Sequence, residues 1–282
     1  NMIAYLPEQY VAPDFAGKVL GEGRITPASF FAGRQWYPTA APAPQYGLIP
    51  LLAGTLWVSL AAILIALPLG LSVAIYMAEL ADSRLRRMLK PVIELLAGIP
   101  SVIYGLLGIL ILNPLMYKLE MIIFANSENH QFTGGANLIS AVLVLALMIL
   151  PTVINISESA LRSVPKHLKS ASLALGATHV QTIFKVIVPA AKSGIITAVV
   201  LGTGRAIGEA MAISLVSGSS VNFPLPFNSV RFLTTAIVSE MSYSQGLHRE
   251  VLFTIGLVLF VFIMIINISL TRILKKGDRE NE

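Results

Sequence analysis

The sequence lacks cysteine and has few charged residues, and both absences narrow the class of protein. Without cysteine there is no disulfide framework and no cysteine-ligated metal site. Charged residues make up 12% of the chain, whereas soluble domains carry about 25%. A protein whose surface is mostly exposed to water is therefore excluded. The four histidines are scattered over loops, which argues against a metal site, and no Gly-x-x-x-x-Gly-Lys-Ser/Thr motif occurs. We therefore expect no metal, no cofactor, no ATP hydrolysis by this chain alone and no enzyme activity.

Long apolar runs take the place of the missing charges. Hydrophobic residues make up 55% of the chain, and a run of about 20 apolar residues is enough to cross a bilayer as a helix. The sequence predicts an all-α membrane protein, a polytopic helical bundle in the lipid bilayer. Its expected spans are Leu51–Ala78, Leu95–Tyr117, Leu138–Ser157, Ser193–Val216 and Val251–Thr271.

Lysine and arginine are unevenly distributed between the connections, which predicts the orientation. They are concentrated after the first and third runs and at the C-terminus, and such connections face the cytoplasm. Residues 1–46 are then an irregular periplasmic segment, residues 47–275 the transmembrane permease domain and residues 276–282 a cytoplasmic tail. An external start without an export signal implies a further N-terminal span upstream, which would make six. The net charge of +5 is not gathered into a patch, so nucleic acid is not an expected partner.

The cytoplasmic connection at residues 161–190 predicts two short helices joined by a glycine turn. Pro165 suits the first turn of a helix, and Gly176 suits a left-handed C-terminal cap. Thr178 and Gln181 have the spacing of a capping box for the second helix, which should carry one apolar face. Such a loop could pack against its own bundle or dock a cytoplasmic protein.

This loop resembles the Glu-Ala-Ala loop of ABC importer permeases, whose pattern is Glu-Ala-Ala, three residues, Gly and an apolar run ending in Pro. Ser170 and Ser172 stand where the family usually has Glu and Ala. We expect the missing carboxylate to weaken one polar contact with the ATPase, while Gly176 and the flanking helix pattern preserve the docking shape. The resemblance implies that the loop docks a separate, dimeric ATP-binding subunit. The docking residues would be Ser170, Ala171, Ser172, Gly176, Ala177, Phe184 and Pro189.

Three further stretches resemble the PstC-type permeases of phosphate ABC importers. They are residues 47–56, residues 94–105, and residues 204–212 with the sequence Gly-Arg-Ala-Ile-Gly-Glu-Ala-Met-Ala. The resemblance implies the type I importer fold, a PstA-like second permease and a periplasmic phosphate-binding protein. It also implies binding-protein-dependent import of inorganic phosphate across the inner membrane. Permeases for sulfate or molybdate are alternatives, and a secondary transporter or a membrane scaffold is a more distant one.

Two ionisable residues, Arg205 and Glu209, lie inside an apolar run, which is costly unless they face a cavity or each other. At positions i and i+4 they are expected on one helix face, where they can pair. The guanidinium fork matches phosphate oxygens, and the matching Arg and Glu of the family are tied to transport. We predict that Arg205 binds the passing anion and that Glu209 holds Arg205 or accepts a hydrogen bond from a protonated phosphate. An ion pair that merely locks helix packing is the alternative.

Other residues of these runs have weaker expected roles. Gly204 and Gly208 form a Gly-x-x-x-Gly motif, which allows a neighbouring helix to approach closely. Ser101 and Tyr104 follow Pro100 and could offer hydroxyl groups to the substrate path, or they could pack helices.

Overall fold

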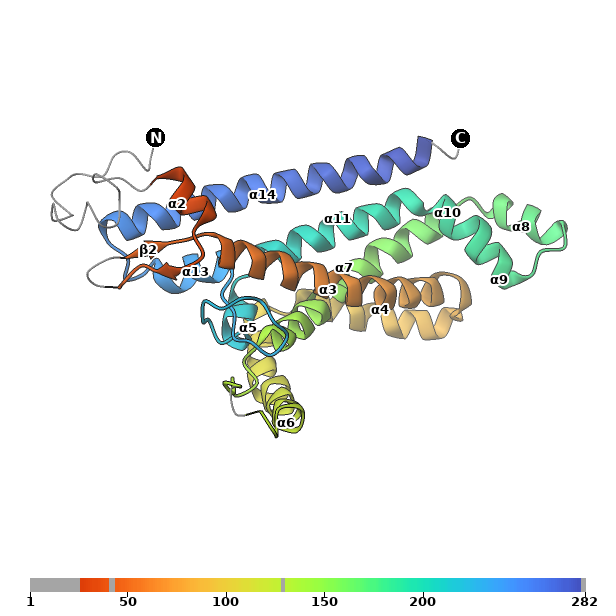
Figure 1. Ribbon diagram of the computed structural model, residues 1–282. Helices are drawn as coiled ribbons and strands as arrows, with labels where there is room; N and C mark the ends of the chain where they lie inside the picture. The colour runs from red at the N-terminus through yellow and green to blue at the C-terminus, as the bar shows by residue number, and fades with distance from the viewer. Residues whose placement is uncertain (1–25, 41–43, 128–129, 280–282) are drawn as a thin grey trace. The chain divides into compact units, whose positions relative to one another are not determined.

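The computed structural model describes residues 26–40, 44–127 and 130–279. The first 25 residues of the expected external segment and the last three residues of the expected tail lie outside the described residues. Apart from two short strands, the regular structure of the described chain is helical, as Figure 1 shows. This confirms the predicted all-α class.

The chain divides into two compact units, each assembled from segments far apart in the sequence. The first unit falls within residues 1–58, 101–144 and 207–263, and the second within residues 59–100, 145–206 and 264–282. Three long helices contribute to both units, namely α3 (Ile49–Ile75), α7 (Leu138–Ser163) and α14 (Gly246–Arg279).

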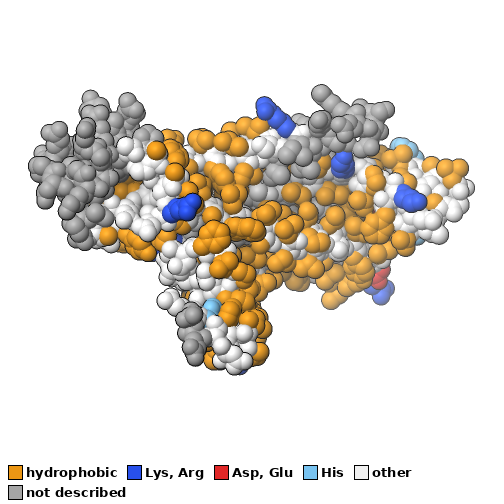
Figure 2. Space-filling model, viewed as in Figure 1, with side chains coloured by type: hydrophobic (Ala, Val, Ile, Leu, Met, Phe, Trp, Pro, Cys, Tyr) orange, Lys and Arg blue, Asp and Glu red, His pale blue; other side chains and the backbone are white. Residues whose placement is uncertain are grey.

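Four helical segments of the described chain are long and apolar enough to cross a membrane. They are Ile49–Leu80, Ser101–Ile123, Leu138–Ser163 and Gly246–Ser269. A fifth is obtained if the pair His179–Ala190 and Lys192–Gly208, bent by 66°, counts as one span. The exposed side chains agree with a lipid environment, since Leu257 and Phe260 of α14 are 60% and 63% exposed. Hydrophobic side chains cover much of the face seen in Figure 2.

The second predicted span begins later than the sequence suggested. Helix α4 (Ser83–Gly98) ends at Gly98, and α5 (Ser101–Leu107) starts a new run that continues through η4 (Gly108–Leu112) and α6 (Asn113–Ile123). Ile99 has an extended backbone with ψ 128°, because the ring of Pro100 disfavours helical geometry in the residue before it. The predicted Leu95–Tyr117 span is therefore corrected to Ser101–Ile123.

The end of the external segment is more regular than the sequence suggested. Thr26 caps α2 (Pro27–Ala32) by accepting a hydrogen bond from the Ser29 amide, and strands β1 (Trp36–Tyr37) and β2 (Gln45–Tyr46) pair antiparallel. The described part of residues 1–46 thus contains short regular elements that the sequence analysis did not predict. The hairpin forms because its aromatic side chains have a partner surface far along the chain.

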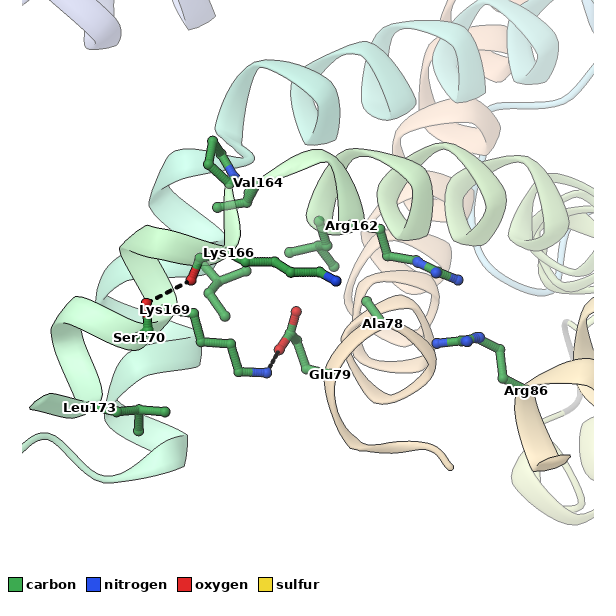
Figure 3. Close-up of a pocket in the computed structure, with 12 residues that line it drawn as sticks. Ala78, Glu79, Arg86, Arg162, Val164, Lys166, Lys169, Ser170 and Leu173 are labelled. Carbon is green, nitrogen blue, oxygen red and sulfur yellow. Dashed lines mark hydrogen bonds and ion pairs between the residues drawn. The ribbon is translucent and has the colours of Figure 1, made fainter. Parts of the chain in front are cut away.

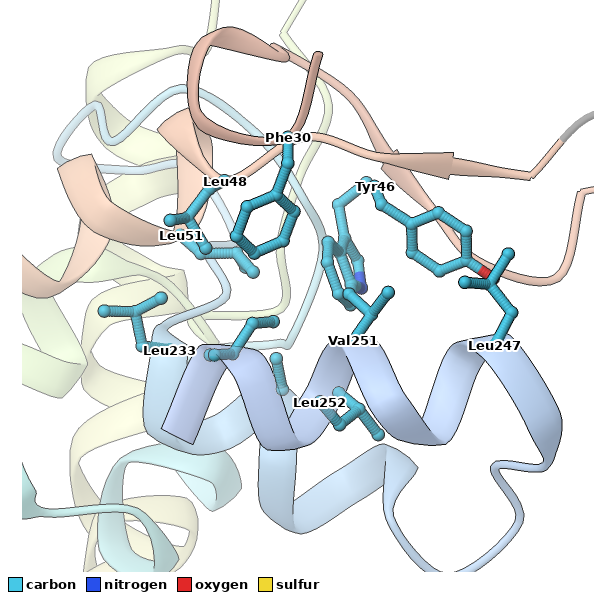
Figure 4. Close-up of a cluster of buried hydrophobic side chains, with 11 residues drawn as sticks. Phe30, Tyr46, Leu48, Leu51, Leu233, Leu247, Val251 and Leu252 are labelled. Carbon is cyan, nitrogen blue, oxygen red and sulfur yellow. The ribbon is translucent and has the colours of Figure 1, made fainter. Parts of the chain in front are cut away.

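That partner surface belongs to α13 (Leu233–Glu240) and the start of α14. Phe30 and Trp36 are each 1% exposed, and they pack in one buried cluster with α13 and α14 (Figure 4). The cluster also contains Tyr46, Leu48, Leu51, Leu233, Ala236, Leu247, Val251, Leu252 and Ile255.

A buried carboxylate lies beside this cluster. Glu240 is 1% exposed; it accepts hydrogen bonds from Trp36 Nε1 at 3.2 Å, pairs with Arg231 and contacts His248 Nε2 at 2.8 Å. Burial, and secondly the charge of Glu240, raises the pKa of Tyr46 to about 12, so its phenol stays neutral. Glu240 therefore joins the hairpin, the loop before α13 and the start of α14 through one polar centre.

Close helix contact in the first unit occurs at two glycines of the α5–η4 run. A Cβ at Gly105 would lie 2.7 Å from Leu215 Cδ1 and 3.0 Å from the Ala212 backbone. One at Gly108 would lie 2.5 Å from Val216 Cγ1. These glycines allow α5 to pack directly on α12 (Met211–Val216).

Candidate functional site

Arg205 lies near the end of α11 (Lys192–Gly208) and is half-buried. Its Nη1 donates a hydrogen bond to the Thr152 hydroxyl on α7 at 3.3 Å. Within the described part of the second unit, no carboxylate forms an ion pair with Arg205. A positive charge in an apolar helix pair thus has a neutral hydroxyl as its partner, which leaves it able to bind an anion.

Thr152 is a candidate site residue that the sequence analysis missed. It follows Pro151 in the middle of an apolar span, and a hydroxyl at such a position was the available signal. The sequence could not assign it to Arg205, because 53 residues separate the two.

Glu209 lies in the first unit, just after the end of α11. Its Oε1 accepts a hydrogen bond from the Ala212 amide at 3.0 Å, and its backbone carbonyl accepts one from the Thr234 hydroxyl at 2.7 Å. The first contact satisfies an amide that the start of α12 would otherwise leave without a partner. Glu209 is therefore held between α12 and α13 rather than along α11.

The expectation that Arg205 and Glu209 share one helix face is wrong. The helix ends at Gly208, and Ala210 has φ −126° and ψ −49°, so the predicted Ser193–Val216 span is two helices with a break. The Glu209 carboxylate stabilises this break by capping the second helix. The roles of Arg205 and Glu209 in substrate binding stay predictions.

The Gly-x-x-x-Gly motif of α11 does not produce the expected close helix contact within either unit. A Cβ at Gly204 would come no nearer than 3.9 Å to the amide of Asn267 on α14, and one at Gly208 meets no atom of the described part of its unit within 4 Å. Both glycines have room on their exposed sides. The close approach is made by Gly105 and Gly108 instead.

Ser101 and Tyr104 lie on the first turn of α5 and are half-buried. The structure places them in the first unit together with Glu209. Their proposed contact with the substrate path stays a prediction.

The loop at residues 161–190 folds as the local motifs indicated. Helix α8 (Lys166–Ala174) is followed by Gly176 with φ +85°, and α9 (His179–Thr182) follows the turn. The capping box is confirmed, since Thr178 Oγ1 accepts from the Gln181 amide at 3.2 Å and Gln181 Oε1 accepts from the Thr178 amide at 2.9 Å. One detail differs: α7 extends to Ser163, so Pro165 precedes the first turn of α8 instead of lying in it.

The apolar side chains after the turn divide between two faces, although one face was expected. The helix continues from α9 through η5 (Ile183–Ile187) and α10 (Val188–Ala190). Ile183 and Ile187 are each 1% exposed and pack against α3 and α7, whereas Phe184 is 60% exposed. The buried face fixes the loop to its own unit, and the second face, which also includes Val180 at 60%, is left open. Leu175, just before the turn, is 90% exposed.

The two serines at the unusual positions of the loop have different partners. Ser172 Oγ lies 2.9 Å from Oγ1 of the buried Thr182, which links α8 to α9. Ser170 Oγ donates to the Lys166 carbonyl at 3.3 Å within its own helix, a contact seen in Figure 3. Ser172 thus braces the loop, while Ser170 is exposed.

Comparison with known proteins identifies the family to which the chain belongs. Residues 66–277 match the model of the binding-protein-dependent transport system inner membrane component. The chain belongs to this family. It is thus a multi-pass inner-membrane permease subunit of an ABC importer, which acts with an ATPase, a substrate-binding protein and a second permease.

The permease is also similar to individual curated proteins. It is 41% identical over 249 residues to the probable ABC transporter permease protein YqgH of Bacillus subtilis, covering 86% of this chain and 77% of that one. It is 34% identical over 256 residues to the phosphate transport system permease protein PstC of Pasteurella multocida, covering 87% and 79%. The resemblance drawn from the sequence motifs is confirmed.

Solved structures confirm the fold of the permease. A bacterial ABC transporter involved in the import of the acidic polysaccharide alginate matches with TM-score 0.61 and 16% identity, over 81% of this chain and 79% of that chain. An inward-facing MetNI methionine ABC transporter matches with TM-score 0.56 and 22% identity, over 82% and 94%.

Proposed function

We propose that this permease subunit translocates inorganic phosphate across the cytoplasmic membrane, driven by ATP hydrolysis in its partner subunit. The observation that carries this proposal is Arg205, a half-buried cation in an apolar span with a hydroxyl as its described partner. A guanidinium binds phosphate oxygens through two parallel hydrogen bonds. The similarity to phosphate permeases named PstC supports the same substrate.

Glu209 is the proposed source of selectivity between oxyanions. One of its carboxylate oxygens accepts from the Ala212 amide, and a carboxylate has acceptor capacity beyond one hydrogen bond. Phosphate carries a proton at neutral pH and can donate it to this group, whereas sulfate has none to donate. Sulfate and molybdate would therefore be poorer substrates.

The function is tested by uptake of radiolabelled phosphate in cells whose own phosphate permease gene is deleted. The full-length gene is expressed with a PstA-like permease, the ATPase and the phosphate-binding protein. We expect uptake that competes with unlabelled phosphate and not with sulfate or molybdate. Uptake that sulfate abolishes, or its absence despite a well-assembled complex, would contradict the phosphate assignment.

The open face of the 161–190 loop is the proposed ATPase docking surface. Leu175, Val180 and Phe184 are all at least 60% exposed, and the buried residues beside them hold the loop in place. The other proposed docking residues lie along the same loop; they are Ser170, Ala171, Ser172, Gly176, Ala177 and Pro189. Closure of the ATPase dimer would move this loop, and the loop would move α11, which carries Arg205.

Phe184→Ala should weaken the ATPase complex by at least about tenfold, because aromatic side chains at the centre of an interface contribute most of its affinity. The measurement is the amount of ATPase retained by affinity-tagged permease over a concentration series. Phe260→Ala is the matched control, since Phe260 is similarly exposed, at 63%, but lies on α14. Equal retention by both variants would contradict docking at Phe184.

We also propose that residues 1–46 lie outside and that the 161–190 loop and the tail from residue 276 lie in the cytoplasm. Because the chain has no cysteine, single cysteines can report this directly. A membrane-impermeant maleimide should label Tyr37→Cys in intact spheroplasts. In permease expressed without the ATPase, which would cover the docking surface, it should label Leu175→Cys solely after the membrane is opened. These positions are 53% and 90% exposed. The reverse pattern would invert the topology.

A further inference from the structure

The second unit contains a cavity of about 490 Å³, and none of the residues proposed for the substrate path lines it. It lies where α8 meets η3 (Tyr76–Leu80) and the first turns of α4. Four basic residues line it, namely Arg86, Arg162, Lys166 and Lys169, together with one acidic residue, Glu79. In Figure 3 the charged ends of Arg86, Arg162 and Lys166 lie around one space beside Glu79.

Carboxylates neutralise part of this positive charge. Lys169 pairs with Glu79 at 2.5 Å, and Arg162 pairs with Glu158 at 3.3 Å. Glu158 also pairs with Lys90 at 3.2 Å, so two carboxylates serve three cations.

Arg86 and Lys166 lie in the same cavity, and their side chains form no ion pair within the described part of the second unit. Like charges held together raise the free energy of the folded chain unless an anion joins them. The cavity therefore has an excess of positive charge that an anionic ligand would stabilise.

We propose that this cavity binds a phosphate group. Arginine offers two parallel donors to tetrahedral oxyanions, and lysine supplies a further point charge. The volume is within the usual range of ligand pockets, so it can hold a single phosphate group or a whole lipid headgroup.

Two sources share this chemistry: free inorganic phosphate and the headgroup of an anionic phospholipid. Helix α4 favours the lipid, because it carries Arg86 and also Met88 and Val92, which are 72% and 52% exposed. A basic turn beside exposed apolar side chains is typical of helices that bind anionic lipid at the interface.

A bound phosphate group would contact α8 on one side and η3 and α4 on the other. Since η3 continues α3, the ligand would also tie α8 to the end of α3. Since α8 opens the proposed ATPase-docking loop, a bound phosphate group would restrict the movement of that loop. This consequence rests on the proposed function, whereas binding to the cavity can be tested without transport.

The experiment uses the complete importer in nanodiscs without its binding protein. In one arm the nanodiscs contain equal phosphatidylglycerol and phosphatidylcholine, and native mass spectrometry counts the phosphatidylglycerol that the complex retains. In the other arm they contain phosphatidylcholine alone, and equilibrium binding of radiolabelled inorganic phosphate is measured. The second arm carries Arg205→Gln throughout, so that the proposed path contributes no binding.

In each arm the parent is compared with Arg86→Gln/Lys166→Gln and with the matched control Arg84→Gln/Arg87→Gln. The control removes two charges from the same helix, but neither residue lines the cavity. We expect saturable binding that the cavity pair weakens about tenfold and the control pair leaves unchanged. Binding that the cavity pair alone weakens, in the lipid arm, the phosphate arm or both, supports the site and identifies its source; binding that neither pair changes places the ligand elsewhere and overturns the proposal. Absence from both arms, or equal loss in both pairs, would overturn the proposal.

Discussion

Arg205→Gln should lower phosphate uptake about a hundredfold while the permease remains in the membrane at its normal amount. Each charge-assisted hydrogen bond contributes about 1.5–3 kcal/mol, so losing a two-bond fork corresponds to at least about a hundredfold in affinity. Glutamine keeps the start of the side chain but ends two bonds short of Nη1, so the change removes both the charge and the hydrogen bond to the Thr152 hydroxyl. Assembly of the complex is therefore measured beside uptake.

The measurement is initial uptake of radiolabelled phosphate, normalised to the permease and ATPase recovered from the membrane. Arg249→Gln is the matched control, because Arg249 is an exposed arginine on α14 and lies far along the chain from the break after α11. Normal uptake by Arg205→Gln with normal assembly would remove Arg205 from the transport path. Loss of assembly together with uptake would instead support a role in helix packing.

Arg205→Lys separates charge from geometry at the same position. Lysine retains the positive charge but lacks the planar fork, so its uptake should lie between those of the native protein and Arg205→Gln. Uptake as low as that of Arg205→Gln would show that the fork, rather than the charge alone, is required.

Glu240→Gln should reduce the free energy of unfolding by about 3 kcal/mol, because it leaves the half-buried Arg231 without its anion. The same change weakens the contacts that the carboxylate makes with Trp36 and His248. Strands β1 and β2 should separate from α13 first, since Trp36 of β1 is linked to α13 through Glu240.

Thermal unfolding of the purified complex measures this effect. A loss of about 3 kcal/mol corresponds to a Tm roughly 8 °C lower in a chain of this size. Glu94→Gln is the control, because Glu94 is an exposed carboxylate on α4. The double variant Glu240→Gln/Arg231→Gln should lose less than the sum of the two single variants. A Glu240→Gln protein as stable as Glu94→Gln would show that the polar centre at Glu240 contributes little to the free energy of unfolding.

Some of the site could be predicted from sequence because its determinants are local. The capping box of Thr178 and Gln181 spans three residues, and the positive φ of Gly176 follows from the absence of a side chain at one position. The long spans follow from uninterrupted apolar composition, which a bilayer translates directly into helices. For the same reason the sequence motifs were enough to indicate the family.

The break after Gly208 shows where local reasoning fails. The spacing of Arg205 and Glu209 is compatible with one helix, no proline interrupts it, and Gly208 fits a Gly-x-x-x-Gly packing motif as well as a helix end. The break depends on partners from another segment, since Thr234 donates to the backbone carbonyl of Glu209. A contact across 25 residues cannot be read from helical periodicity.

The sequence by itself determined that this protein is a membrane-spanning helical permease with a glycine-hinged loop, because hydropathy and capping act within a few neighbouring residues. Tertiary structure decided which face of the loop is buried at Ile183 and which is open at Phe184. It also decided the polar centre at Glu240, which joins Trp36 across 204 residues of chain. The physical reason is that burial and ion pairing depend on which distant segments meet, and side-chain packing specifies that meeting.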